Sequence, residues 1–453
     1  MPPLFMENMQ CKMDLPKAVE FCMQALGQAG FEAYAVGGCV RDSLLGLTPH
    51  DYDLCTNAQP EETARVFADF TLVRSGEKHG TIGVVIDKAV IEITTFRTEG
   101  GYQDSRHPDW VRFVSNLHED LARRDFTVNA MAYSPETGYI DPFGGREDLK
   151  NHILRTVGDP ELRFSEDALR ILRGVRFGVR FQLTPEEATL KAMKTLSPLM
   201  DKLARERVFD ELCKLLPLVT AKDLLMYRDI LVQALPALAP CVDFAQHNPH
   251  HRYDVFTHTA QVVEGVPSDL VLRWAALLHD CGKPDCFFLD ENGRGHFHGH
   301  AKVSAEKADA LLFSLKAPTA LRERVVFLIA HHMTELTPDK KVLRRRLGKY
   351  GVQAVFDLLA LQKADFGGKG TKEESDSFSE VHRLLEEILS EDACLTVQDL
   401  AIDGKDLLQL GFPAGKVLGS CLTYLLEQVQ DEQIPNHRET LLDSAKVFFQ
   451  NNL

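Results

Sequence analysis

Apolar residues recur along the chain with two different periods, and the point where the period changes divides the chain into two parts. Near residues 15–29 they recur every three or four positions, which predicts an amphipathic helix. FEAYAV (31–36), TIGVVI and AVIEITTF are short β-rich runs between charged loops, which predicts strands. After about residue 150 helical spacing continues through ELRFSEDALRILRGVRFGVRF and beyond. The pattern predicts an α/β first third followed by a nearly all-helical remainder.

These elements predict four regions in chain order. The clearest linker is a glycine- and charge-rich segment, FGGKGTKEESDS (366–377). We expect an α/β head at residues 14–150, a helical neck at 151–235, a helical body at 236–370 and a helical tail at 371–453.

Composition narrows the class of protein. A chain of 453 residues with 44% hydrophobic and 26% charged residues is typical of a soluble protein with several packed units. The stretch MPPLFMENMQCKMDLPK has neither a basic start nor a continuous apolar run, and no later segment approaches membrane-spanning length, so we expect a cytoplasmic protein without a membrane partner. Ten cysteines without a C-x-x-C pair indicate reduced thiols. The net charge of −15 means that any RNA must meet a local basic surface.

A pair of aspartates follows the first predicted strand. In HDYDLCT, Asp51 and Asp53 are one residue apart, and on an extended strand this spacing puts both carboxylates on one face, where they can share Mg²⁺. Upstream, GGCVRD places two glycines where a strand turns into a helix, which exposes backbone N–H groups to a phosphate chain, and Arg41 adds a charge. Glu92, in VIEITTF, is a candidate third catalytic carboxylate. Each part alone is common in solvated turns, but together they predict two-metal phosphoryl transfer.

Over roughly residues 30–215 the chain resembles the class II tRNA nucleotidyltransferases and bacterial poly(A) polymerases of the polymerase-β-like superfamily. The motifs that carry the resemblance are, in order, AVGGCVRDSLLGLTPHDYDLCTNA, GEKHGTIGVV, IEITTFRTEGGYQDSRHP, EDLARRDFTVNAMAY, IDPFGGREDL, SEDALRILRGVRF and ARERVFDEL. The resemblance implies a polymerase-β-like palm in the head and makes Asp51 and Asp53 the Mg²⁺ ligands. The nucleotide-binding residues that it implies are Gly37, Gly38, Arg41, Arg124, Asp125, Asn129, Asp167, Arg170, Arg173 and Arg176.

Two of these residues suggest how the protein selects a base without a template. Asp167 and Arg170 are three residues apart on a predicted helix and therefore neighbours on one face. Cytosine and adenine both present an exocyclic amine beside a ring-nitrogen acceptor, which a carboxylate and a guanidinium match, whereas uracil and guanine reverse that pattern. Related enzymes use this pair in the same role. Without the surrounding motifs, an exposed salt bridge would explain it equally well.

The motifs also favour one reaction within the family. GEKHGTIGVV resembles the CCA-adding type, whereas poly(A) polymerases of this class carry a distinct basic box after the first motif. The loop TEGGYQDSRHPDW (98–110) resembles the flexible element that enzymes adding the complete CCA contain. We therefore expect addition or repair of the 3′-terminal CCA of tRNA from CTP and ATP. The alternatives are a poly(A) polymerase and a CC-adding enzyme.

The predicted body resembles the HD superfamily through VFTHTAQVV, LRWAALLHDCGK, HFHGHAK and LIAHHM. The resemblance implies a transition-metal site, for Ni, Mn, Co or Fe, that hydrolyses phosphate or 2′,3′-cyclic phosphate ends, with Lys283 available to steady the phosphate. The candidate metal ligands are His258, His279, Asp280 and His300, followed by His331 or His332 and by Asp365. Two further interpretations are that this hydrolase is the main activity and that the chain is an RNA-binding scaffold with inactive sites.

Basic residues gather in two places in this acidic chain. One is the series Arg163, Arg170, Arg173, Arg176 and Arg180, and the other is the run DKKVLRRRLGKY (339–350), for which a solvated helix face is an equal interpretation. The tail, from LTVQDLAIDGKDLLQLGFPAGKVLGS onward, resembles the C-terminal helical region of CCA-adding enzymes that carry an HD domain. A tRNA acceptor arm that spans both basic patches would reconcile the acidic composition with an RNA substrate.

Overall fold

The computed structural model describes residues 12–100, 110–248, 252–370, 377–391 and 393–451. They form two compact units: residues 1–218 with 226–236, and residues 219–225 with 237–453. The boundaries of the four predicted regions stay predictions; the predicted neck at 151–235 is divided, since residues 219–225 belong to the second unit. No helix in the described ranges is long and apolar enough to span a membrane.

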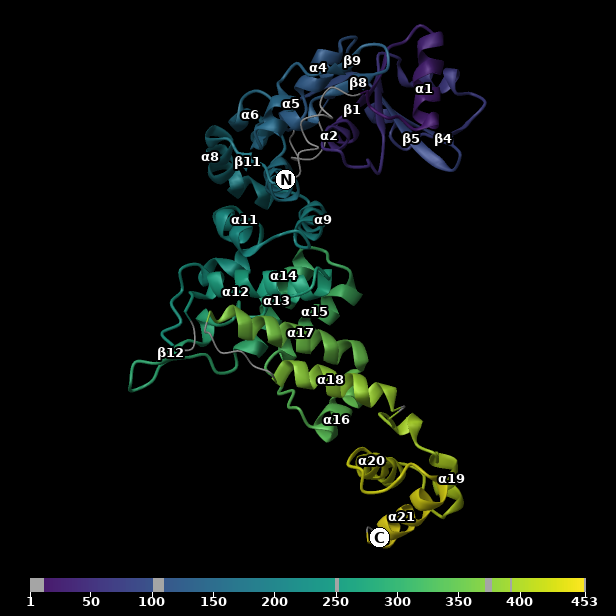
Figure 1. Cartoon of the computed structure of the whole chain (residues 1–453), viewed down its shortest axis with the longest axis vertical. Helices are drawn as coiled ribbons and strands as arrows, with labels where there is room; N and C mark the ends of the chain where they lie inside the picture. Colours follow the sequence, from purple (N-terminus) through teal and green to yellow (C-terminus); the bar gives the residue numbers. More distant parts are fainter. Residues whose placement is uncertain (1–11, 101–109, 249–251, 371–376, 392, 452–453) are drawn as a thin grey trace. The chain divides into compact units, whose positions relative to one another are not determined.

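The head of the first unit is built on a seven-stranded mixed sheet (Figure 1). Its strand order is β3-β4-β5-β2-β1-β8-β9, in which β2 and β5 are parallel and the other pairs are antiparallel. The strands are β1 (Ala33–Val36), β2 (Asp53–Thr56), β3 (Thr71–Val73), β4 (Thr81–Ile86), β5 (Ala89–Thr95), β8 (Ala132–Ser134) and β9 (Gly138–Ile140). A separate ribbon pairs β6 (Arg97–Gly100) with β7 (Trp110–Phe113).

Helices of the head bury apolar stripes as their spacing predicts. In α1 (Lys17–Gln28) the buried residues are Val19, Cys22, Met23 and Leu26, which share one helical face. The other helices of the head are α2 (Gly38–Leu44), α3 (Pro60–Val66), α4 (Leu117–Ala122) and α5 (Gly145–Lys150). The neck follows with α6 (Pro160–Glu166), α7 (Leu169–Phe181), α8 (Glu187–Leu196), α9 (Arg205–Leu215) and α11 (Arg228–Ala234). The α/β head and helical remainder are therefore confirmed.

In the residues that the structure describes, the regular elements of the second unit are helices apart from one short hairpin, β12 (Phe288–Leu289) with β13 (Gly295–His296). Aspartates start its helices: Asp254, Asp269 and Asp339 each accept backbone N–H groups of the first turn. The helices are α10 (Ala221–Met226), α12 (Val255–Gly265), α13 (Leu270–Leu278), α14 (His300–Ser314), α15 (Thr319–His331), α16 (Lys340–Tyr350), α17 (Val352–Gly368), α18 (Ser377–Ser390), α19 (Gly404–Gln409), α20 (Lys416–Gln430) and α21 (Arg438–Asn451).

One predicted linker is partly wrong. The segment 366–377 begins inside a helix, because α17 continues to Gly368 and α18 starts at Ser377. Gly368 lies in van der Waals contact range of His258 and Val262 on α12, so its lack of a side chain serves helix packing there and not chain flexibility. Residues 371–376 lie outside the described ranges, as do residues 101–109 of the loop predicted at 98–110.

Candidate functional sites

Three carboxylates meet at the edge of two parallel strands in the head. Asp53 opens β2, and its register partner on β5 is Glu92. Asp51 lies two residues earlier, before the strand begins, so the predicted placement of both aspartates on one strand is correct only for Asp53. All three residues are exposed. Desolvation of the Asp53 carboxyl, and then the negative charges of Glu92 and Asp51, raise its pKa, against the opposing charge of Arg124. Oxygen donors whose mutual repulsion a cation would relieve fit a divalent ion such as Mg²⁺.

The glycine turn before these strands has a steric reason. Gly37 has φ 74° and ψ −120°, a conformation that only glycine adopts readily, and a Cβ there would lie 2.7 Å from Nη1 of Arg124. The N–H of Gly37 donates to the carbonyl of Met131 at 3.1 Å. The N–H of Gly37 is therefore not one of the backbone groups that this turn leaves for a phosphate, whereas Gly38 starts α2.

Arg41 is held inside the head rather than extended from it. Its side chain pairs with Asp42 at 2.6 Å, donates to Oδ1 of Asn129, and lies 4.2 Å from the centre of the Phe181 ring. Only 5% of the residue is exposed. Burial lowers the pKa of Arg41, and Asp42 opposes this effect. The aromatic stacking from Phe181 of α7 was not foreseen from the sequence, because the two residues are far apart in the chain.

The motif RRDFTVNA forms two linked ion-pair clusters. Asp120, which is fully buried, accepts from Arg123 at 3.0 Å and from Arg124 at 3.3 Å. Asp125 pairs with Arg173 of α7 at 2.6 Å and accepts from the side chain of Asn129 at 3.0 Å. Desolvation opposes ionisation of Asp125, but the charge of Arg173 and these hydrogen bonds hold its pKa well below the ordinary value. Asp120 is thus a positioning residue that the sequence analysis missed.

Asp167 does not lie on the helix that carries Arg170. Its backbone is extended (φ −144°, ψ 103°) after the end of α6, and its carboxylate accepts from the backbone N–H of Leu169 at the start of α7. The same carboxylate pairs with Arg207 of α9 at 2.8 Å. Arg170 instead pairs with Glu166 at 2.6 Å. The predicted helical placement of Asp167 is wrong because this residue terminates α6 and bonds the first turn of α7.

Arg176 is buried in the neck. Its Nε lies 2.6 Å from Oε2 of Glu211 on α9, and its guanidinium packs over the Phe177 ring at 4.4 Å. Arg176 is 8% exposed and Glu211 is 5% exposed. Since α7 and α9 pack against each other, this ion pair joins them at their contact. The sequence offered no signal for Glu211 as the partner.

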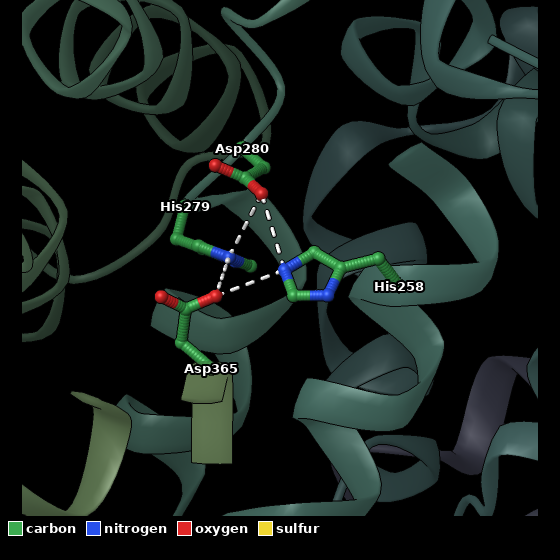
Figure 2. Close-up of side chains that lie close together, drawn as sticks. All are labelled: His258, His279, Asp280 and Asp365. Atoms are coloured by element: carbon green, nitrogen blue, oxygen red, sulfur yellow. Dashed lines mark ion pairs between the residues drawn. The ribbon is translucent and has the colours of Figure 1, made fainter. Parts of the chain in front are cut away.

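In the second unit, two histidines and two aspartates converge (Figure 2). Nε2 of His258 lies 2.9 Å from Oδ1 of Asp365 and 3.3 Å from Oδ2 of Asp280. Nε2 of His279 lies 3.2 Å from the same Asp280 oxygen and 3.7 Å from Asp365. The donor atoms all lie within 4.8 Å of one another. The four residues come from α12, from the end of α13 and from α17, so the packing of these helices assembles the candidate metal centre.

A second group shares Asp280. Oδ1 of Asp280 lies 3.4 Å from Nε2 of His300, and that nitrogen lies 3.1 Å from Nε2 of His332. In His279, His300 and His332 the Nδ1 atom lies 2.7–2.8 Å from a backbone carbonyl oxygen, to which an Nδ1–H donates. Their Nε2 lone pairs then point inward, the arrangement of metal-binding histidines. His331 points elsewhere, with its ring against Phe327 and Tyr350.

The charges of this centre also fit a metal. Burial would lower the pKa of His279, but Asp280 and Asp365 raise it to about 10. Burial and then the charge of His279 lower the pKa of His332 to about 4. The neutral imidazole of His332 beside the buried carboxylate of Asp280 belongs to a donor set for a transition-metal ion. Lys283 adds one cation, 2.7 Å from Asp280 and 2.9 Å from Oε1 of Gln246.

The basic run 339–350 is partly paired within the second unit. Arg344 of α16 is buried and pairs with Glu391 at 3.2 Å and Glu432 at 2.6 Å. Arg345 pairs with Asp431 at 2.7 Å, and Lys340 pairs with Glu387 at 2.6 Å. These contacts join α16 to α18 and to the end of α20. Acidic side chains therefore neutralise three of the six basic residues of this run, and RNA binding by the run stays a prediction.

Three family models match the chain. The poly A polymerase head domain matches residues 33–155, the probable RNA and SrmB-binding site of polymerase A matches 182–241, and a putative tRNA nucleotidyltransferase domain 2 matches 296–445. These matches cover the carboxylate site and the tail.

Relatives match nearly the whole length. A CCA-adding enzyme of Levilactobacillus brevis is 35% identical over 435 residues, which are 94% of this chain and 98% of that protein. One from Streptococcus gordonii is 33% identical over 92% of this chain and 94% of its own length. The crystal structure of the Bacillus stearothermophilus CCA-adding enzyme in complex with CTP superposes with a TM-score of 0.74 and 28% identity over 100% of this chain and 99% of that one. The chain therefore belongs to the CCA-adding enzymes, which are tRNA nucleotidyltransferases of the class that includes bacterial poly(A) polymerases.

Proposed function

We propose that this chain adds or repairs the 3′-terminal CCA of tRNA in the cytoplasm, using CTP and ATP without a nucleic-acid template. The observation that carries the proposal is the meeting of Asp51, Asp53 and Glu92 at the edge of β2 and β5 in a chain whose relatives over more than nine-tenths of its length are CCA-adding enzymes. The relative solved with CTP supports that nucleotide as one substrate.

The three carboxylates have the catalytic role in this proposal. Asp51 and Asp53 would hold Mg²⁺, and Glu92 would add its charge from the neighbouring strand. Bound Mg²⁺ supplies activation of the tRNA 3′-hydroxyl and neutralises the leaving pyrophosphate. The sheet contributes alignment, because paired strands fix the carboxylates relative to one another before substrates arrive.

Nucleotide binding falls to the residues around the glycine turn. Gly37 leaves room for the guanidinium of Arg124, which Asp120 holds, so this cation is in place for the triphosphate without reorganisation. Gly38 lets the chain approach the phosphates closely. Arg41 and Asn129, bonded to each other, complete this wall.

Asp125 links the turn to α7 and would bind the ribose. Its Oδ2 is occupied by Arg173, and Oδ1 already accepts from the backbone N–H of Phe126 and the amide of Asn129. A ribose hydroxyl can add a further bond to a carboxylate, which has about four lone-pair sites. We propose that Asp125 and Arg173 act as a pair.

Base selection would rest on Asp167 and Arg170, with Arg207 and Glu166 as positioning residues. The carboxylate of Asp167 would accept a hydrogen bond from the exocyclic amine of cytosine or adenine. Uracil and guanine would instead place an unpaired carbonyl against that carboxylate. Arg207 orients the carboxylate of Asp167 through their ion pair, and Glu166 orients the guanidinium of Arg170 in the same way. For Arg176 we propose a role different from the one that the resemblance implies: it joins α7 to α9 through Glu211.

Substitution of the carboxylates tests this site. Asp53→Asn keeps the side-chain shape but removes the charge, and we expect incorporation of labelled CMP into tRNA lacking its CCA to fall by a factor of about 10³ or more. The matched control is Asp69→Asn, an exposed aspartate of the same head, which should incorporate like the wild type. Equal activity of the two variants would overturn the assignment.

We also propose that the second unit is an HD-type metal-dependent phosphohydrolase acting on phosphate or 2′,3′-cyclic phosphate ends. The supporting observation is the inward orientation of Nε2 in His279, His300 and His332 around Asp280. A bound transition-metal ion would supply Lewis-acid chemistry for hydrolysing a phosphate ester. Lys283, fixed by Gln246, keeps a cation beside the centre for the phosphate.

The adjacent histidines on α15 provide a matched test. His332→Ala removes a proposed ligand, whereas His331→Ala alters the neighbouring residue, whose ring packs on Phe327. We expect the first variant to lose bound metal, measured by elemental analysis, and hydrolysis of 2′,3′-cyclic AMP, and the second to keep both. Equal hydrolysis and equal metal content in the two variants would refute the hydrolase proposal.

A further inference from the structure

A cluster of three rings lies on the hairpin of the second unit. Phe288 of β12 lies 5.3 Å from His296 of β13 at an interplanar angle of 24°, and His298 lies 5.6 Å from His296 at 22°. Phe288 and His298 are also 5.4 Å apart, but tilted at 44°, so the three rings form a cluster in which His296 lies nearly parallel to each of the other two. We call Phe288, His296 and His298 the ring platform. Phe288 is 46% exposed and His298 is exposed, so these rings do not serve a hydrophobic core.

The ring platform is fixed to the body of the unit. Asp290 closes the hairpin by accepting the backbone N–H groups of Asn292 and Arg294, and its other oxygen lies 2.9 Å from Nε2 of His296. The backbone at Gly295 lies so close to the backbone at Gln246 that a Cβ on residue 295 would lie 2.1 Å from the carbonyl oxygen of Gln246. The rings are therefore held at a set distance from the helices that carry the metal centre.

One cavity extends from two rings of the platform, His296 and His298, to the metal centre; Phe288 packs on these two rings and is not among the residues that line the cavity. The cavity has a volume of about 420 Å³ and is lined by His296 and His298 as well as by Asp280, His300 and His332. Its lining also includes two lysines, Lys283 and Lys369, and the amide of Asn248. The volume is within the range of small-ligand sites. The cavity thus has an end with cations and metal ligands and an end with flat rings.

The platform histidines are not further metal ligands. In the part of the chain that the structure describes, both groups of potential ligands exclude His296 and His298. Near-parallel rings present their faces to a ligand, and every nucleobase has a π-face that stacks on such rings. A ligand with an anionic end and a flat end matches the two ends of the cavity.

We propose that this cavity takes a nucleoside phosphate, with its phosphate at the metal centre and its base on the ring platform. The inference rests on the hydrolase proposed above. It adds that the hydrolase recognises the base of a nucleotide and therefore does not accept every phosphate ester equally. His298 would be a specificity-determining residue, and Phe288 and Asp290 would be positioning residues that hold the two histidine rings.

The test compares a nucleotide with a phosphate ester that has no ring to stack. The double variant Phe288→Ala, His298→Ala and the wild type, both as full-length protein with Mn²⁺, are assayed on 3′-AMP and on glycerol 2-phosphate, and binding of 3′-AMP is measured by calorimetry. The matched control is Phe313→Ala, an equally accessible ring on α14 that is 62% exposed. Since the platform rings are exposed, the double variant should fold like the wild type.

We expect the KM and the Kd of the double variant for 3′-AMP to rise about tenfold, as the loss of base stacking predicts, with kcat and the hydrolysis of glycerol 2-phosphate unchanged. An unchanged Kd for 3′-AMP would overturn the role proposed for the ring platform. An equal loss of activity on 3′-AMP and on glycerol 2-phosphate would also overturn it. If the wild type hydrolyses neither ester but binds 3′-AMP in a platform-dependent way, the platform stands and the hydrolase fails. Binding lost equally in Phe313→Ala would also overturn the inference.

Discussion

The ion pair between Arg176 and Glu211 gives the sharpest test of how the neck is built. Both side chains are less than a tenth exposed, and Nε of Arg176 lies 2.6 Å from Oε2 of Glu211. Glu211→Gln leaves the guanidinium buried beside an amide that cannot neutralise it. Removing one partner of a buried pair costs about 3–5 kcal/mol, which is a fall of roughly 10 °C in Tm at about 2–4 °C per kcal/mol for a unit of this size.

A purely structural role for this ion pair predicts a result that a role in nucleotide contact does not: recovery of stability in a double variant. If the pair only joins α7 to α9, the variant Arg176→Met, Glu211→Met should regain most of the lost stability, because well-packed apolar residues can replace a buried ion pair. A control is Lys194→Ala, which removes an exposed pair with Asp229 in the same unit and should cost less than about 1 kcal/mol.

Thermal melts monitored by circular dichroism measure the stability, and incorporation of CMP well below the lowest Tm measures the activity. We expect KM for CTP to change less than about threefold in the double variant, since neither side chain would contact the nucleotide. A KM for CTP raised more than tenfold with a wild-type Tm would refute this reasoning and return Arg176 to the nucleotide site.

Three further predictions address the remaining sites. Gly37→Ala should lower the free energy of unfolding by about 1–3 kcal/mol in thermal melts, because residue 37 has a positive φ. It should also raise KM for both nucleotides, because the new Cβ would lie 2.7 Å from Nη1 of Arg124 and displace that side chain. Wild-type stability together with wild-type KM would contradict the role proposed for this turn. Asp167→Asn should reduce discrimination against UTP by roughly 10²-fold in single-nucleotide assays, because an amide N–H can pair with the uracil carbonyl that a carboxylate repels; unchanged discrimination would exclude this residue from base selection. Asp365→Asn should lower the metal content of the purified protein, and full occupancy would remove it from the centre.

Local pattern was enough to predict the elements and several site residues. The strand that leads into the glycine turn and the spacing of Asp51 and Asp53 depend on residues next to one another, so the sequence shows them directly. The register that sets Glu92 opposite Asp53 depends on pairing between distant strands, and sequence spacing suggested only that Glu92 lay on a strand.

Partners brought in by tertiary packing could not be predicted. Arg207 and Glu211 of α9 neutralise Asp167 and Arg176 from a distant part of the chain, and each is an ordinary charged residue of an amphipathic helix in the sequence. Asp120 differs, because it lies four residues before Arg124, a spacing that could have indicated this ion pair.

The choice between His331 and His332 was open because it also depends on tertiary packing. Neighbours on a helix point about 100° apart, and only the packing of α15 shows that His332 faces Asp280.

The reaction product tests the central claim most directly. Purified protein with Mg²⁺ is given tRNA that ends before its CCA, together with CTP, ATP, UTP and GTP singly and in mixture, and the extended 3′ ends are sequenced. Addition of C, C and A that then stops, and that Asp53→Asn abolishes, is the result that the account predicts. A long A tail would show a poly(A) polymerase, extension by C and C alone would show a CC-adding enzyme, and either outcome would contradict CCA addition by this chain.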